Sequence, residues 1–375
     1  MTMKKMAYRF VLSFLILIAV VPAINLGLKI LRHQSNTITW NKAALYSLDF
    51  ALPWISNIFY QAGISLAPDQ VVIGKDDWLY LGDRYANELS VTRTGASPQD
   101  IVAVQKIGIA TKAWADWMHG HGVQAFKIML FPTKQTIYPE FLPAWVKPAT
   151  HSAADTLLSN TAPGVYVDTR AAVKAAKEHF SVPLYYKTDS HWNSLAAWIA
   201  FAAFTKELNR VEAGMQFFAA EDAEVAAVNE RIAGDLANFL GMTAILHDKD
   251  VYIKVLGTTQ FDQLQIPTEQ YDFNSGKLLA SEGNPQIATP RLAMLIKSKK
   301  ALNQKRVLWL HDSYGVAVTP YMAATFSETL HLHYDATTPE LLADLVQRFK
   351  PDFVFISVVE RQARMDWFSN LPPKH

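Results

Sequence analysis

The sequence contains no cysteine in its 375 residues. This absence excludes disulfide bonds, thiolate nucleophiles, zinc–thiolate centres and a lipid-modified cysteine. It does not identify the cellular compartment, because many exported proteins also lack cysteine. The sequence also lacks a glycine-rich phosphate-binding loop, an internal repeat and any low-complexity segment. We therefore expect neither a nucleotide site of the common loop type nor a repeat fold.

An excess of charge of one sign is also missing. The chain has 35 basic and 34 acidic residues, which gives a formal net charge of +1. Proteins that bind nucleic acids usually carry a basic stripe, so we expect no nucleic-acid partner. Half of the residues are hydrophobic, which is enough for a sizeable core in one large or two ordinary domains.

One long hydrophobic run is present at the amino terminus. Three basic residues within the first nine positions precede an apolar run over 10–24, which continues more weakly to Leu31. As a signal peptide, the segment would be cleaved near residues 21–23. As an anchor, residues 10–31 are about long enough to cross a hydrocarbon layer of roughly 30 Å. We favour the uncleaved anchor because apolarity continues beyond Ala23 and the cleavage site is poor.

The basic residues before the run place the amino terminus in the cytoplasm and the rest of the chain outside it. The expected organisation has four parts. They are a cytoplasmic basic tail over 1–9, a transmembrane anchor over 10–31, a connector with short helices over 32–70 and a catalytic domain over 71–375.

Buried strands alternate with helices in the rest of the chain, which is typical of a parallel sheet flanked by helices. Expected strands lie over 123–131, 165–167, 184–186, 307–310 and 352–359, and expected helices over 97–119, 171–178 and 339–349. Residues 212–231 are interpreted as loop and helix. Residues 250–300 are irregular and rich in strand formers, so we expect a β-rich insertion there.

The strand over 307–310 stops abruptly at the residues His311, Asp312 and Ser313. The carboxyl ends of strands in open α/β sheets are where ligands bind. A serine hydroxyl there needs a base to remove its proton and a third group to orient the base. Asp312 is expected to hold the turn through hydrogen bonds to the backbone, and His311 to pack.

Asp189 and His191 can supply the base and the orienting group. Side chains two positions apart on an extended segment point the same way, so Asp189 can accept from one imidazole nitrogen while the other faces a serine. Each motif alone is weak, because Asp, Ser and His are common on polar turns. Their joint occurrence at the ends of expected strands predicts a nucleophilic triad of Ser313, His191 and Asp189.

Three other residues are candidates for binding substrate. Lys134 and Arg361 each follow an expected strand, and Tyr314 is the neighbour of Ser313. The alternatives are a solvated lysine and, for Arg361, a salt bridge with Glu360 or Asp352. No histidine spacing predicts a metal site, since a pair such as His331 and His333 more often lies on a strand edge. No metal or cofactor is expected.

Five segments together resemble the SGNH-hydrolase-like proteins of the alginate O-acetyltransferase type, the AlgJ and AlgX type. They are residues 72–80, 132–139, 189–192, 234–236 and 311–314. The Asp-x-His-Trp motif precedes the serine motif, whereas the serine comes first in ordinary SGNH hydrolases, so the order is permuted. The resemblance covers most of residues 71–361 as scattered motifs.

The resemblance implies a flavodoxin-like SGNH fold in the periplasm, anchored in the inner membrane, that transfers acetyl groups to hydroxyls of an exopolysaccharide. It carries the catalytic roles to Asp189, His191 and Ser313. It also implies a polysaccharide substrate and a membrane-bound acyl-transferring partner protein. This sequence departs from the pattern at His311, where glycine usually precedes Asp-Ser, and this leaves only the Ser313 N–H as a named oxyanion donor.

Two alternatives to the transferase stay open. A polysaccharide acetylesterase would use the same triad with water as the acceptor. A non-catalytic scaffold of an export or acetylation complex would need no triad at all. The sequence does not decide among alginate, acetylated cellulose and other polymers.

Overall fold

The computed structural model describes residues 3–31, 42–255, 266–283 and 286–374. Parts of the expected connector and of the expected β-rich insertion, residues 32–41, 256–265 and 284–285, lie outside this range. The first helix, α1, spans Met3–Leu31. Within the described ranges, no helix combines the length and the apolarity needed to cross a membrane.

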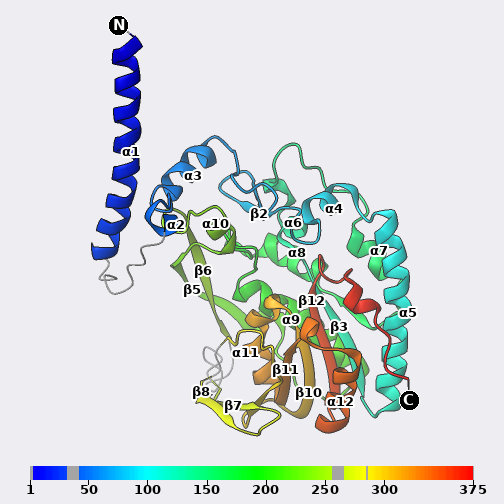
Figure 1. The fold of residues 1–375 in the computed structure, drawn as a ribbon. Helices are drawn as coiled ribbons and strands as arrows, with labels where there is room; N and C mark the ends of the chain where they lie inside the picture. The colour runs from blue at the N-terminus through cyan, green and yellow to red at the C-terminus, as the bar shows by residue number, and fades with distance from the viewer. Residues whose placement is uncertain (1–2, 32–41, 256–265, 284–285, 375) are drawn as a thin grey trace.

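An eight-stranded sheet forms the centre of the domain (Figure 1). In spatial order its strands are β4 (Tyr166–Asp168), β3 (Ala125–Phe131), β12 (Phe353–Val359), β10 (Asn303–His311), β11 (Phe326–His333), β9 (Met294–Ser298), β7 (Thr268–Asp272) and β8 (Leu278–Glu282). The first five strands are parallel to one another, and the last three pair antiparallel. The sheet is therefore mixed, and the expectation of a parallel sheet is corrected.

The antiparallel part comes from the region expected to be a separate insertion. β9 pairs with the edge of β11, and β7 then continues the ladder outward. An unpaired edge strand exposes a row of backbone hydrogen-bonding groups, so adding strands there satisfies them. The β-rich segment thus extends the central sheet.

Helices cover both faces of the parallel part (Figure 1). They include α5 (Pro98–Gly120), α8 (Arg170–His179), α9 (Ser194–Val211) and α12 (Pro339–Phe349). Alternate residues of β12 point to opposite faces: Phe353 and Phe355 belong to the core beneath α9, and Val354 and Ile356 to the core beneath α5 and α12. Burial on both faces explains why every residue of β12 is apolar or small.

Helix starts agree with the capping signals in the sequence. Ser97 forms a capping box with Asp100, and Pro98 occupies the first turn of α5. Shorter helices lie before the first strand and between later strands. They are α2 (Lys42–Leu45), α3 (Leu52–Gln61), α4 (Glu88–Thr94), α6 (Lys134–Ile137), α7 (Ala153–Ser159), α10 (Asp235–Phe239) and α11 (Thr319–Thr325).

Two antiparallel pairs lie outside the central sheet. β1 (Val71–Ile73) pairs with β2 (Leu79–Leu81). β5 (Ala223–Ile232) pairs with β6 (His247–Val255), so the interpretation of 212–231 as loop and helix is wrong from Ala223 onward, whereas 212–222 form a loop that ends in a short 3-10 helix. The alanine and glutamate residues of β5 favour helix locally, but pairing with β6 overrides this preference.

Candidate active site

Ser313 lies where β10 ends, at the start of a short 3-10 helix over Ser313–Val318. Asp312 is buried and accepts hydrogen bonds from the backbone N–H of Tyr314 at 2.9 Å and of Val359 at 2.7 Å. Burial raises the pKa of the Asp312 carboxyl, and these N–H groups oppose the rise. The turn is thus held by Asp312, as expected, and it leaves the Ser313 side chain exposed.

The structure brings the three predicted catalytic residues together. His191 Nε2 lies 2.8 Å from Ser313 Oγ, and His191 Nδ1 lies 2.7 Å from Asp189 Oδ1. Burial alone would raise the pKa of Asp189, but the hydrogen bond and charge of His191, with the charge of Arg231, hold it below its usual range. The result is one continuous hydrogen-bonded chain from a buried carboxylate to an exposed hydroxyl.

The segment that carries Asp189 and His191 differs from the expectation. No strand of the central sheet comes directly before this segment. The expected strand over 184–186 is only an isolated bridge between Tyr185 and Trp192. Trp192 Nε1 donates to the carbonyl of Tyr314 at 3.1 Å, and the Tyr314 hydroxyl donates to the carbonyl of Ser190 at 2.6 Å. These two bonds fix the His191 segment to the Ser313 turn.

The same contacts correct one substrate-binding prediction. Tyr314 is 0% exposed, and its hydroxyl is engaged with the Ser190 carbonyl. Its side chain therefore joins the two parts of the site from beneath, where substrate does not reach.

Lys134 is also inside the protein, so neither the substrate contact nor the solvated alternative describes it. It is 2% exposed, and its ammonium group donates to the carbonyls of Leu79 at 2.8 Å and Lys187 at 3.1 Å. Burial lowers its pKa to about 8, although Asp189, Asp248 and Asp235 favour the charged form. Lys134 thus ties β2 to the chain just before Asp189.

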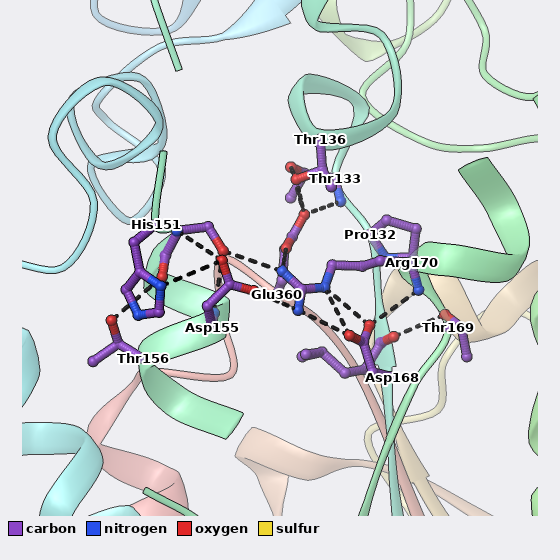
Figure 2. A network of polar contacts seen from close by, with 12 residues as sticks. Pro132, Thr133, Thr136, His151, Asp155, Thr156, Asp168, Thr169, Arg170 and Glu360 are labelled. Carbon is purple, nitrogen blue, oxygen red and sulfur yellow. Dashed lines mark hydrogen bonds and ion pairs between the residues drawn. The ribbon is translucent and has the colours of Figure 1, made fainter. Parts of the chain in front are cut away.

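Arg361 is buried beside the same turn. Its guanidinium carbon lies 5.3 Å from the centroid of the Tyr314 ring. The salt bridges considered for it are not formed in the described part of the chain, where Glu360 pairs with Arg170 (Figure 2) and Asp352 with Lys305. Arg361 lines a cavity that none of the three triad residues lines, so its contact with substrate stays a prediction.

Sequence reasoning missed the role of the motif over 234–236. Asp235 accepts hydrogen bonds from the backbone N–H and the hydroxyl of Ser190, both at 2.6 Å. Its Oδ2 lies 3.8 Å from His191 Nδ1, so a second carboxylate flanks the imidazole. The Gly-Asp pair was visible in the sequence, but nothing there indicated that Asp235 would contact Ser190, 45 positions earlier.

Among the described residues, one group of possible metal ligands has its atoms close enough together to hold an ion. It consists of Asp189, His191 and Asp235. Both carboxylates, however, already accept hydrogen bonds from the His191 loop. The arrangement therefore fits an oriented imidazole better than a cation site.

Gly234 is required by the close approach of Asp189. A Cβ at Gly234 would lie 2.2 to 2.5 Å from the Asp189 side chain. We expect Gly234→Ala to displace the carboxylate and to lower kcat for ester cleavage by about 100-fold, because small misplacements of catalytic groups are that costly. Steady-state kinetics measure the effect. Gly120→Ala is the control, since a Cβ there meets nothing within 4 Å. Unchanged kcat in Gly234→Ala would contradict the prediction.

Glu88 predicts a pH dependence of stability. It is 5% exposed, and burial raises its pKa to about 7 against the opposing charge of Arg361. Its unfolded pKa is about 4.3, so between these values the folded state binds more protons, and stability falls as pH rises through this window. The expected loss is roughly 3 kcal/mol.

We expect Glu88→Gln to abolish that loss, which urea unfolding at about pH 5 and about pH 8 measures. The exposed Glu221→Gln variant is the control and should keep the wild-type difference. If Glu88→Gln showed the same difference in stability between the two pH values as the wild type, Glu88 would not titrate in this window.

Comparisons with solved structures find the same fold elsewhere. PatB1 of Bacillus cereus superposes with a TM-score of 0.58 at 16% identity, over 80% of this chain and 98% of that one. A DHHW family protein of Eubacterium siraeum gives a TM-score of 0.51 at 16% identity, over 72% and 90%. The O-acetyltransferase domain of Pseudomonas putida AlgJ gives 0.48 at 18% identity, over 79% and 92%. No curated protein sequence matches the chain.

A family comparison identifies the chain more directly. The family described as "SGNH hydrolase-like domain, acetyltransferase AlgX" matches residues 71–289, more than half of the chain. The matched segment includes Asp189, His191 and the Gly-Asp motif, and it ends before Ser313. On this match, the chain belongs to the AlgX family of SGNH hydrolase-like acetyltransferase domains.

Proposed function

We propose that the protein is an O-acetyltransferase that moves acetyl groups onto hydroxyls of an exopolysaccharide, alginate or a similar polymer. One observation carries the proposal: the hydrogen-bonded chain from Asp189 through His191 to the exposed Ser313. Such a chain activates a serine for acyl transfer. Membership of an acetyltransferase family supports acetyl as the transferred group.

The mechanism follows from these contacts. His191 Nε2 takes the proton of Ser313 as Oγ attacks the acetyl carbonyl of the donor, and the same proton leaves with the donor's leaving group. Asp189 keeps the Nδ1 proton in place and stabilises the charged imidazole. A sugar hydroxyl then attacks acetyl-Ser313, His191 takes its proton, and that proton returns to Ser313 as the sugar ester departs. The Ser313 N–H is one donor to the developing oxyanion.

Acetyl transfer by the full-length protein in detergent tests the proposal. We expect release of the leaving group from a chromogenic acetyl ester, and acetyl esters on an added polysaccharide detected by NMR. Leaving-group release with acetate as the sole product would favour the acetylesterase. No release by the wild type, in a preparation that folds and assembles normally, would favour the non-catalytic scaffold.

We also propose that α1 anchors the protein in the inner membrane, with residues 1–9 in the cytoplasm and the domain over 71–375 in the periplasm. Large apolar side chains on the described part of α1 are exposed, including Val11, Phe14 and Ile16. Exposed apolar side chains in such number favour contact with lipid or another apolar surface. A membrane-bound acyl-transferring partner would supply acetyl groups to Ser313.

Extraction of membranes at alkaline pH tests the anchor. We expect the full chain to stay with the membrane pellet and a chain lacking residues 1–31 to be released. Recovery of a shortened, soluble mature protein from the full-length gene would instead establish a cleaved signal peptide.

A further inference from the structure

Two buried histidines, in contact with each other, lie next to the Ser313 turn. His311 is 0% exposed and His331 is 1% exposed. They stand on the parallel neighbours β10 and β11, where Trp309 is the register partner of His331. The His311 ring stacks on the Trp309 ring with centroids 4.0 Å apart, and the His331 ring meets the His311 ring edge-on at 5.4 Å. The proposed mechanism uses neither histidine.

The ring nitrogens of this pair form a hydrogen-bonded chain that ends at the Asp312 carbonyl. His331 Nδ1 lies 3.3 Å from His311 Nε2, and His311 Nδ1 lies 3.0 Å from the Asp312 carbonyl oxygen. A carbonyl oxygen can only accept, so His311 Nδ1 carries the proton. Burial lowers the pKa of His311 to about 3, so the ring is neutral near neutral pH. Its Nε2 is then free of a proton and accepts from the Nδ1–H of His331.

The far end of the chain is consistent with this direction. His331 Nε2 has no hydrogen-bond partner among the described residues. Burial also lowers the pKa of His331, so this ring too is neutral, and with its proton on Nδ1 the unpartnered Nε2 carries only a lone pair. An apolar side chain would fill this place without the cost of burying a polar group. The cost points to a function at the other end of the chain, where the Asp312 carbonyl lies.

Three donors meet at the Asp312 carbonyl oxygen. Besides His311 Nδ1, the Thr289 hydroxyl donates to it at 3.1 Å and the Gly315 N–H donates at 3.1 Å. The glycine is required here, because a Cβ on Gly315 would lie 2.5 to 2.8 Å from the His311 side chain. A larger residue would therefore push the imidazole away from the carbonyl.

The Asp312 carbonyl and the Ser313 N–H belong to one peptide group. The group is planar, so donors that hold its oxygen also fix the direction of its N–H. Hydrogen bonds accepted at the oxygen polarise the group and strengthen the N–H as a donor. This N–H is the donor to the oxyanion named above, and such donors act best when they are oriented before the reaction.

We propose that His311 is a positioning residue for the oxyanion, acting through the peptide group between Asp312 and Ser313. Thr289 assists at the same oxygen, and His331 holds the His311 ring. The inference rests on the proposed acyl transfer, and it gives a role to the histidine that stands where glycine usually precedes Asp-Ser. It applies equally to an acetyltransferase and an acetylesterase, because both reactions pass through the same oxyanion.

Two readouts on the full-length protein in detergent test the proposal. The first is steady-state cleavage of a chromogenic acetyl ester. The second is the affinity for trifluoroacetone. Ser313 Oγ bonds to the carbonyl carbon of this ketone, the carbonyl oxygen takes the negative charge, and the serine proton passes to His191 Nε2. The adduct thus reports the stability of the oxyanion without a leaving group.

His311→Phe keeps a ring in place but removes the donor. We expect it to lower kcat by about tenfold, to leave KM within about twofold, and to weaken trifluoroacetone by the same factor as kcat. Thr289→Val should act in the same direction by about threefold. His311→Asn should recover most of the loss, because its side-chain NH₂ group can donate from the place of Nδ1.

Val307→Ala is the matched control, because Val307 is buried in the same core cluster as Trp309 on the same strand. It should lower stability to urea while kcat and the affinity for trifluoroacetone stay within about twofold of wild type. The pH midpoint of kcat/KM should be the same in His311→Phe and in the wild type, since Asp189 and His191 are untouched. A shifted midpoint would show that the triad itself had moved, and it would overturn the proposal.

Proton–nitrogen correlation spectra of the imidazole rings test the direction of the chain. We expect the proton on Nδ1 in both His311 and His331, and a proton on Nε2 of His311 would overturn the proposal. Unchanged kcat and inhibitor affinity in His311→Phe, or no recovery in His311→Asn, would do the same. Failure of the catalytic proposal is recognised separately, because the wild type would then neither cleave the ester nor bind trifluoroacetone.

Discussion

Ser313→Ala should lose cleavage of a chromogenic acetyl ester by about 10⁴-fold or more while the protein stays folded. The reason is geometric. His191 Nε2 has Ser313 Oγ as its partner at 2.8 Å, and the serine is exposed at the carboxyl end of β10. Removing the hydroxyl removes the atom that carries the acetyl group, and no other hydroxyl can replace it, because Ser190 Oγ is bonded to Asp235.

The alanine variant should fold because the turn does not depend on the serine side chain. Asp312 and Tyr314 hold the turn through the bonds to Val359 and Ser190. Near-UV circular dichroism and urea unfolding check this point. Ser327→Ala is a matched control, since Ser327 makes one bond to the Lys305 carbonyl at the opposite end of the same strands. Full activity in Ser313→Ala would refute the nucleophile.

The sequence predicted the parts of the site that lie on local signals. A buried strand followed by Asp-Ser, and Asp-x-His on an extended segment, identify their residues without any knowledge of the fold. The relation between Ser313 and His191, 122 residues apart, could only be inferred from the rule that strand ends meet at one edge. That inference placed the residues together, although the His191 segment is held by a bridge to Trp192 and does not follow a strand of the sheet.

The errors have a common physical cause. Lys134 and Tyr314 resemble substrate-binding residues in the sequence because polar side chains near a site are usually exposed. Both are buried, and both bond to backbone carbonyls of the segment between Lys187 and Ser190. Whether a polar group faces substrate or supports the site depends on long-range packing, which residue order does not reveal.

The sheet illustrates the same limit. Apolar runs predicted four of the five parallel strands, β3, β4, β10 and β12, because burial on both faces leaves a continuous hydrophobic signal, whereas β11 was not predicted. β7, β8 and β9 are short and partly exposed, so their sequence shows strand preference without showing which partner they pair with. The pairing of β9 with β11 depends on the free edge of the parallel sheet, whose strands come from segments both before and after β9 in the chain.

Asp189→Asn should reduce the rate of acetyl-ester cleavage by about 10⁴-fold with little change in substrate KM. The ionised carboxylate accepts from both the backbone N–H and the Nδ1 of His191 through Oδ1, while its Oδ2 lies 3.6 Å from the Arg231 guanidinium. An amide in this place would direct its NH₂ group toward Arg231 or toward His191. With the NH₂ group toward Arg231, two donors would face each other. With the NH₂ group toward His191, Nδ1 would have to accept a hydrogen bond, so the imidazole proton would move to Nε2 and His191 could not take the Ser313 proton.

Acid unfolding provides the second readout. The pKa of Asp189 is lower in the folded protein than its unfolded value of about 3.9, so its ionised form stabilises the fold above that pH and the contribution is lost as pH falls below it. Asp189→Asn should lack this loss, so its stability should change less than that of the wild type between about pH 5 and about pH 3.

Asp235→Asn is the matched comparison for both readouts. Asp235 lies 3.8 Å from the same nitrogen, but both of its oxygens accept hydrogen bonds from Ser190. Its loss should therefore disturb the position of the loop without changing the tautomer of the imidazole. We therefore expect a smaller fall in rate, about 10- to 100-fold. If the two variants were equally impaired, the imidazole would be oriented by the pair of carboxylates acting together. If Asp235→Asn were the worse of the two, the assignment of Asp189 as the orienting residue would be wrong.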